Sequence, residues 1–150
     1  MTTAEDIMTR DCITVRPDTD ISEAARLLLE ENINGIPVVD QNNRLIGIIC
    51  QSDLVAMQKK ISLPSVFTLL DSLVPLASMS RVDREIRKIT AARVEDAMTP
   101  EPLAVTRATP IEELAQIMVD KKFHTLPVVE DKKLLGVVGK ADVLKTLLKE

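Results

Sequence analysis

The chain has 150 residues, of which 45% are hydrophobic, and its formal net charge is −4 with a pI near 5.1. This length suits one compact domain or two very small ones, and the acidic balance argues against a general nucleic-acid binder. Phe67 and Phe123 are the only aromatic residues, which argues against a stacking platform for single strands. No apolar run approaches a membrane span, so we expect a cytoplasmic protein in which Cys12 and Cys50 are reduced thiols.

The first part of the chain predicts a strand, a helix, a hairpin and a second helix. A β-branched run at 13–15 ends before Pro17, as a short strand does. From Ile21, apolar residues recur at i, i+3, i+4 and i+7, which predicts an amphipathic helix with Thr19 as its N-cap. The remaining elements are two strands joined by a polar turn and a closing helix, expected at 36–39, at 45–49 and from Gln51.

Residues 58–93 differ from what precedes and follows them. Their apolar residues keep helical spacing in two stretches, the first ended by Pro75: Val66, Leu69, Leu70 and Leu73, then Val82, Ile86 and Ile89. Two interpretations stay open. The segment is a helical connector packed on the outside, or its apolar run is a contact surface for a second subunit or a partner.

The rest of the chain repeats the first part. Residues 95–144 match residues 5–55 at an offset of 90 positions up to Pro127, and at 89 after one residue is lost in the hairpin turn. The repeated helix begins with a capping-box pattern at 109–112, and strands are expected at 126–129 and 134–138 before a helix from Lys140. Such a duplication predicts one β-α-β-β-α unit used twice about a pseudo-twofold axis, with a cleft between the copies.

The duplicated motifs resemble a tandem pair of cystathionine-β-synthase-type (CBS) domains, called a Bateman module. The matching features are the Met-Thr openings, the helix starts, the Pro-Val-Val strands and the strand-to-helix ends, at Met8-Thr9 and Met98-Thr99, Thr19 and Thr109, 36–39 and 126–129, and 47–53 and 136–142. The resemblance implies a mixed α/β fold with repeats at 1–57 and 94–150 and a helical connector at 58–93. It also implies homodimers and an adenine nucleotide or adenosyl ligand in the cleft.

Asp53 and Asp142 are the first candidates for ligand contact. Each lies near the first turn of a helix, where a carboxylate can simply cap the free backbone N–H groups. The resemblance implies a second role, because the family's aspartate at this position accepts both hydroxyls of a ribose. Both interpretations stay open, and two sites per chain are possible.

Other polar residues are candidates for the phosphate side of the cleft. The family usually has Ser or Thr three residues before the aspartate, and here Cys50 and Gly139 stand there, so phosphate contact is expected from backbone N–H groups. His124, the single histidine, is either a phosphate contact or a half-buried structural residue, and Asn34 is its counterpart. Lys140 and Arg16 are further cationic candidates.

The base of the ligand needs an apolar slot with backbone partners. The candidates are strand residues of the two repeats, which plain core packing would explain equally: Thr14, Val15, Ile36 and Pro37, then Ala104, Val105, Leu126 and Pro127. Cys50 has two interpretations of its own, a redox-sensitive thiol with a lowered pKa at a helix N-terminus or an inert buried one.

These residues favour a non-catalytic sensor that binds AMP, ADP, ATP or S-adenosylmethionine and acts through a separate effector protein. An enzyme is the first alternative, but the sequence has one histidine, no metal-ligand cluster, no nucleophile motif and no glycine-rich phosphate loop. No catalytic cofactor and no metal are expected. The second alternative is a structural dimerisation module with vestigial ligand sites.

Overall fold

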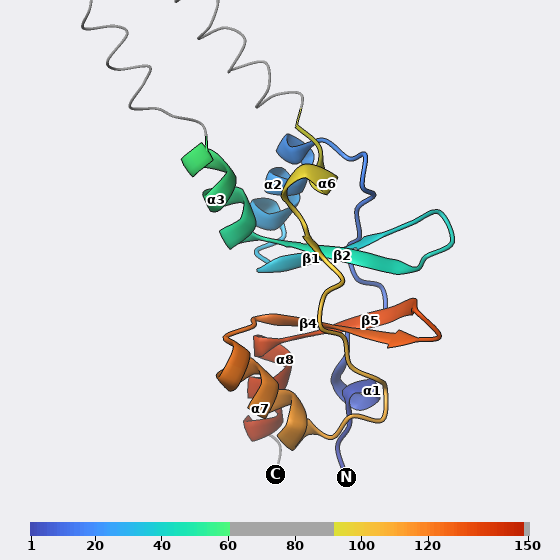
Figure 1. Ribbon diagram of the computed structural model, residues 1–150. Helices are drawn as coiled ribbons and strands as arrows, with labels where there is room; N and C mark the ends of the chain where they lie inside the picture. Colours follow the sequence, from blue (N-terminus) through green and yellow to red (C-terminus); the bar gives the residue numbers. More distant parts are fainter. Residues whose placement is uncertain (61–91, 149–150) are drawn as a thin grey trace, which may run out of the picture.

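The computed structural model describes residues 1–60 and 92–148, and its two hairpins lie one above the other with helices on their outer sides (Figure 1). The first hairpin pairs Gly35 with Cys50 and Val38 with Gly47. Its elements are α2 (Ile21–Glu30), β1 (Gly35–Val39), β2 (Leu45–Cys50) and α3 (Gln51–Lys60). The two predicted helices and the two predicted hairpin strands of the first repeat are therefore confirmed, each beginning within one or two residues.

The second repeat has the same order of elements. Its hairpin pairs Thr125 with Gly139 and Val128 with Gly136, and both hairpins have a register shift at the equivalent Val-Val step. The elements are α7 (Ile111–Lys121), β4 (Thr125–Glu130), β5 (Lys133–Gly139), α8 (Lys140–Lys145) and the 3₁₀ turn η1 (Thr146–Leu148). The mixed α/β architecture expected from the duplication is confirmed.

Three local predictions need correction. The expected first strand at 13–15 is reduced to a single parallel bridge between Val15 and Val38. Thr19 is not the N-cap of α2: Asp20 holds that position, and the Thr19 hydroxyl instead accepts the Arg16 N–H at 3.0 Å. Pro110 likewise precedes α7 directly, while Thr109 closes a turn with Thr106. The apolar residues singled out between 66 and 89 lie outside the described residues.

The opening segment of each repeat packs in the core of the other repeat. Helix α1 (Ala4–Ile7) packs in the core of the second repeat, where Ala4 is fully buried, and α6 (Val94–Ala97) packs in the core of the first, where Val94 is fully buried. The strand β3 (Thr99–Pro100) then pairs with β2, and Thr9 pairs with Val137 of β5 in the same way. Figure 1 shows α1 beside the lower helices and α6 beside the upper ones.

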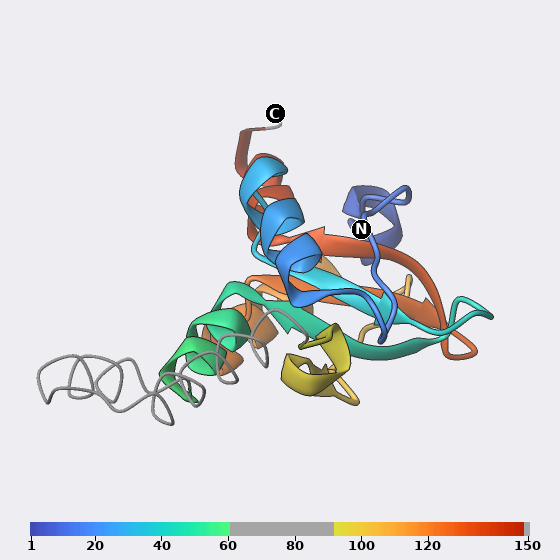
Figure 2. The same cartoon turned by 90° about the horizontal axis from the view of Figure 1, so that it is seen from above.

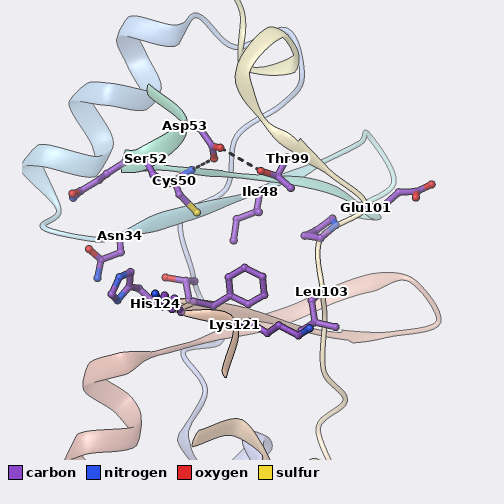
Figure 3. A pocket seen from close by; sticks show the side chains of 15 residues that line it. Asn34, Ile48, Cys50, Ser52, Asp53, Thr99, Glu101, Leu103, Lys121 and His124 are labelled. Carbon is purple, nitrogen blue, oxygen red and sulfur yellow. Dashed lines mark hydrogen bonds between the residues drawn. The ribbon is translucent and has the colours of Figure 1, made fainter. Parts of the chain in front are cut away.

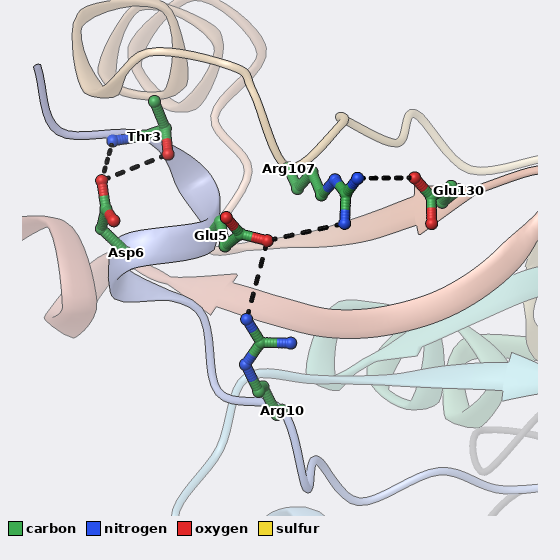
Figure 4. A network of polar contacts seen from close by, with 6 residues as sticks. All are labelled: Thr3, Glu5, Asp6, Arg10, Arg107 and Glu130. Atoms are coloured by element: carbon green, nitrogen blue, oxygen red, sulfur yellow. Dashed lines mark hydrogen bonds and ion pairs between the residues drawn. The ribbon is translucent and has the colours of Figure 1, made fainter.

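Backbone hydrogen bonds fix this exchange on both sides. The Ala4 N–H donates to the Thr109 carbonyl at 2.8 Å, and the Val94 N–H donates to the Thr19 carbonyl at 2.8 Å. In the α1 helix, the Asp6 carboxylate accepts the Thr3 N–H at 2.8 Å (Figure 4). These bonds satisfy helix-end donors that no intrahelical partner reaches, so the exchanged segments are part of the fold.

Exposed ion pairs surround the α1 exchange. Glu5 lies 3.7 Å from Arg10 and 3.7 Å from Arg107, and Arg107 lies 3.3 Å from Glu130 of β4 (Figure 4). Because all four side chains are substantially exposed, each pair contributes about 1 kcal/mol or less. The buried apolar contacts and backbone bonds therefore contribute most to holding the exchanged segments.

The two hairpin turns also touch. Asn43 Nδ2 donates to the Leu134 carbonyl at 3.0 Å, and the Leu45 N–H donates to the Lys132 carbonyl at 2.9 Å. Both turns point to the same side in Figures 1 and 2, away from α2, α3, α7 and α8. The repeats are thus joined at one edge by their turns, and along the middle by the exchanged segments.

We predict that Gly136→Ala weakens the exchange. A Cβ at Gly136 would lie 2.5 Å from the Thr9 carbonyl oxygen, so the exchanged segment has to move, and the free energy of unfolding should fall by about 1–3 kcal/mol. Gly139→Ala is the matched control, because its Cβ would meet its nearest neighbour, Asp142 Oδ2, at an ordinary 3.5 Å. Urea unfolding of both variants gives the comparison, and equal stabilities would contradict the close packing of Thr9 on β5.

Candidate functional site

A cavity of about 580 Å³ lies between the two repeats and is lined by both (Figure 3). The first repeat contributes the end of the α2–β1 loop, the end of β2 and the start of α3. The second repeat contributes the segment after β3 and the stretch between α7 and β4. The lining residues are Asn34, Ile48, Cys50, Gln51, Ser52 and Asp53, then Thr99, Glu101, Pro102 and Leu103, then Lys121, Lys122, Phe123, His124 and Thr125.

Asp53 caps a helix and lines the cavity. Its Oδ2 accepts the Cys50 N–H at 2.7 Å and so caps α3, while its Oδ1 accepts the Thr99 hydroxyl of the exchanged strand β3 at 3.3 Å. A carboxylate has about four acceptor positions, so the half-buried Asp53 keeps capacity for further donors. The carboxylate is therefore held in place at the cavity wall.

Asp142 has the same cap but a different setting. Its Oδ2 accepts the Gly139 N–H at 2.7 Å. It lines neither this cavity nor the second one described below. The two aspartates are equivalent as helix caps and unequal as cavity residues, which makes them a matched pair for experiment.

Asn34 and His124 both line the cavity, as expected from their equivalent places in the repeats. The Asn34 carbonyl accepts the Gln51 N–H at 3.2 Å, and the His124 carbonyl accepts the Lys140 N–H at 3.0 Å. Each residue is therefore fixed through its backbone to the start of the following helix. Figure 3 shows their side chains near each other from the two repeats.

The backbone N–H groups at the very starts of α3 and α8 are already hydrogen-bonded within the protein. At α3 the first two N–H groups, of Cys50 and Gln51, are bonded to Asp53 and Asn34. At α8 the N–H groups of Gly139 and Lys140 are bonded to Asp142 and His124. These four N–H groups are therefore already bonded within the protein, and phosphate contact from the remaining N–H groups of each first helical turn stays a prediction.

Cys50 lines the cavity as a protonated thiol. Burial is the main cause that raises the pKa of Cys50, to about 11, and the nearby Asp53 carboxylate adds to it. Burial also raises the pKa of Cys12. The lowered pKa of the redox interpretation is therefore wrong, and the inert thiol is the better description.

Two cationic candidates lie elsewhere. Lys140 lines a second cavity of about 490 Å³ over α7 and α8, which His124 also touches. Arg16 is exposed and lines neither of the two cavities.

The candidates for the base slot lie mostly in the two packed cores. Six are buried, and these are Val15, Ile36, Pro37, Val105, Leu126 and Pro127. The backbone between them is also occupied, because the Val15 N–H donates to the Pro37 carbonyl at 3.1 Å and the Val105 N–H donates to the Pro127 carbonyl at 2.9 Å. This placement favours core packing for the six. Thr14 is exposed and Ala104 half-buried, and neither lines the cavity.

Most of the apolar wall of the cavity comes from residues that the sequence did not single out for ligand contact. Ile48, Pro102 and Phe123 line it together with Leu103. Lys121, Lys122 and Glu101 bring charge. The two adjacent lysines at 121 and 122 could have indicated an anion contact from the sequence. Only the tertiary structure shows that the end of α7 and the start of α3 line the same cavity.

Two further observations limit the chemistry. Within residues 1–60 and 92–148, no group of three or more His, Cys, Asp or Glu residues is arranged to hold a metal ion. In the same part of the chain, no helix has both the length and the apolar character needed to cross a bilayer.

Comparison with known proteins agrees with this geometry. The CBS domain family matches the chain twice, over residues 4–60 and 94–149. The chain belongs to the CBS domain family. The two matches correspond to the two repeats. CBS-pair proteins are typically regulatory.

Individual relatives cover the whole CBS pair. CBSX1, a chloroplastic CBS domain-containing protein of Arabidopsis thaliana, is 33% identical over 97% of this chain. The structure of CBSX2 of the same plant in complex with AMP has a TM-score of 0.75 at 30% identity and covers 99% of this chain and 97% of that one. This chain spans 64% of the length of CBSX1 and 58% of the length of CBSX2.

A more distant pair has the same fold. The CBS domain pair of protein MJ0100, solved with 5′-methylthioadenosine and S-adenosyl-L-methionine, has a TM-score of 0.69 and covers 98% of this chain and 96% of that one. Its identity to this chain is 24%, so it is evidence for the fold alone.

We predict that Cys50 reacts slowly with iodoacetamide at neutral pH. In a Cys12→Ala variant, the alkylation rate should rise with a midpoint near pH 11, because burial disfavours the thiolate. The same variant unfolded in urea is the control and should titrate near pH 8.5. As the unfolded thiol ionises first, the free energy of unfolding should fall as pH rises from about 8.5 to 11. A folded-state midpoint below pH 8 would contradict this burial.

Proposed function

We propose that this chain is a regulatory CBS module that binds an adenine nucleotide or a related adenosyl compound in the cavity between its two repeats. One observation carries the proposal: a single cavity holds Asp53 of the first repeat and His124 of the second. The carboxylate suits the two hydroxyls of a ribose, and Ile48, Leu103 and Phe123 supply apolar area for a base. The volume of about 580 Å³ lies within the usual range of small-molecule sites, about 300–1,000 Å³.

The comparison with CBSX2 supports the ligand class. That protein was solved in complex with AMP and is 30% identical to this chain over nearly its whole length. AMP is therefore the first ligand to test, with ATP and S-adenosylmethionine beside it.

Regulation is proposed because the ligand would touch both repeats. A ligand shifts the equilibrium between two arrangements only if it binds one of them more tightly. A ligand that bridges Asp53 and His124 meets this condition, because any change in the separation of the repeats changes its contacts. We propose that this change is passed to a separate effector protein, and that the module itself is not an enzyme and takes no catalytic cofactor.

A homodimer is part of the proposal. Four large apolar side chains stand exposed on the outer helices, at places equivalent in the two repeats: Leu29 (77%), Val55 (65%), Val119 (74%) and Leu144 (54%). Helices α2, α3, α7 and α8 that carry them lie on one side of the molecule in Figure 1. A patch that repeats about a pseudo-twofold axis suits contact with a second copy of itself. The cytoplasmic location stays a prediction.

We predict that Asp53→Ala removes AMP binding and that Asp142→Ala leaves it intact. Both substitutions delete the same helix-cap bond, worth about 1 kcal/mol, and Asp53→Ala also removes the bond from the Thr99 hydroxyl, so it should be somewhat the less stable variant. Only Asp53 faces the cavity. Isothermal titration of both variants and wild type with AMP, ATP and S-adenosylmethionine separates the outcomes. Loss of binding in the Asp142 variant alone would refute the assignment, and a wild type that binds none of the three would favour the structural dimerisation module.

We also predict that the double substitution Leu29→Glu and Val119→Glu yields monomers. Charges at the two equivalent exposed positions should prevent apolar contact while leaving the fold intact, because neither side chain belongs to a core. Sedimentation equilibrium gives the mass, and Ser22→Glu with Gln116→Glu is the control, because it adds the same two negative charges at other exposed positions of α2 and α7. A double variant that remains dimeric would rule out this face.

A further inference from the structure

We propose that a groove over α7 and α8 receives the end of α2 from a second copy of this chain, so that the first repeat of each subunit faces the second repeat of its partner. This head-to-tail arrangement rests on the homodimer of the proposed function and specifies its orientation. The groove is the second cavity described above, of about 490 Å³, and is called the α7–α8 groove below. Its apolar lining consists of Ala115, Met118, Val119, Phe123, Val143 and Leu144.

The polar residues that line the α7–α8 groove are all basic. They are Lys122, His124 and Lys140, and no carboxylate lines the groove. Within residues 1–60 and 92–148, no ion pair involves either lysine. An apolar floor beside ammonium groups that lack an ion-pair partner is complementary to an exposed apolar side chain flanked by carboxylates.

The end of α2 on the first repeat has this composition. Leu29 is 77% exposed, and Glu30 and Glu31, both exposed, follow it directly. Glu30 lies 2.6 Å from Arg26, whereas no ion pair involves Glu31 in the described part of the chain. Leu29 does not line the α7–α8 groove of its own chain, so a second copy is needed to bring the two together.

Charge distinguishes this arrangement from a head-to-head dimer. The apolar contacts of the two dimers are alike, because Leu29 and Val119 are equivalent in the repeats. The exposed residues at four equivalent positions differ, and they are Lys121, Lys122, Lys140 and Lys145 in the second repeat and Glu31, Asn32, Gln51 and Ala56 in the first. A head-to-head dimer would place these lysines against the same lysines of the partner subunit. A head-to-tail dimer places Glu31 against lysines, so opposite charges meet and the arrangement is favoured.

The local helices do not explain the charges of Glu31 and Lys140. Glu31 is the C-cap residue of α2, and Lys140 is the first residue of α8. The helix dipole favours a cation at the first place and an anion at the second, so each residue carries the less favourable charge for its own helix. An ion pair between Glu31 of one subunit and Lys140 of the other gives both charges a partner. About a twofold axis this contact is made twice, which closes the dimer.

The first test reverses the two charges one at a time. Glu31→Lys and Lys140→Glu should each raise the dissociation constant of the dimer about tenfold, because an attractive pair becomes repulsive in both copies of the contact. The double variant should regain the wild-type constant. Both changes suit the local helix dipole, so weaker association would not reflect unfolding. Lys132→Glu is the matched control, since Lys132 lies in the β4–β5 turn and lines neither described cavity. Sedimentation equilibrium at low salt gives the constants.

The second test determines the orientation directly. In a background of Cys12→Ala with Cys50→Ala, subunits that carry Leu29→Cys are mixed with subunits that carry Val119→Cys and are oxidised by dissolved oxygen. A head-to-tail dimer should give disulfide-linked dimers from the mixture and none from either variant alone. Non-reducing electrophoresis separates the linked dimers from single chains.

Three results would overturn the inference. A dimer that tightens or stays unchanged on each single charge reversal is head-to-head, because the reversal then relieves or preserves repulsion between like charges. Disulfide linkage in Leu29→Cys alone leads to the same conclusion. A wild type that stays monomeric refutes both the orientation and the homodimer of the proposed function, whereas the AMP titration of Asp53→Ala tests the ligand cavity separately.

Discussion

The exchange of opening segments between the repeats is the constraint on which the rest of this structure depends. Ala4 completes the core of the second repeat and Val94 that of the first, and each is fixed by a 2.8 Å backbone hydrogen bond to the loop that precedes the other repeat's helix. Neither repeat has a complete core from its own contiguous residues. Separation of the repeats would therefore expose buried apolar surface in both, which makes their pairing part of folding itself.

The exchange also builds the cavity. The β3 strand that follows α6 pairs with β2 through Ile48 and Thr99, and this pairing brings Thr99 within 3.3 Å of Asp53. The residues after β3, including Leu103, then form a wall facing His124. A ligand in this space would contact the start of α3, the exchanged segment and the end of α7 together. No single repeat contains this site, so its shape depends on how the two repeats pack.

The two repeats share a fold but differ in the charge of the residues at equivalent cavity positions. Asp53 and Asp142 cap their helices through equal 2.7 Å bonds, so the duplication preserves what the helix start needs. Asn34 and His124 differ where the backbone is equivalent, and both line the cavity. Evolution of a duplicated module can change such positions without disturbing either core, since these side chains are exposed.

The sequence by itself determined the repeats, the order of their main elements and the aspartate, histidine and asparagine that line the cavity. These follow from local signals, because apolar periodicity and strand-to-helix junctions are properties of contiguous residues. Only the tertiary structure decided which aspartate faces the cavity, that α1 and α6 exchange places, and that Asp53 and His124 line one cavity. Those facts depend on contacts between residues far apart in the chain. The predicted base slot shows what sequence patterns leave open. An apolar strand residue such as Ile36 fits the pattern of a core residue and of a ligand contact equally well. Its complete burial in the structure favours the core.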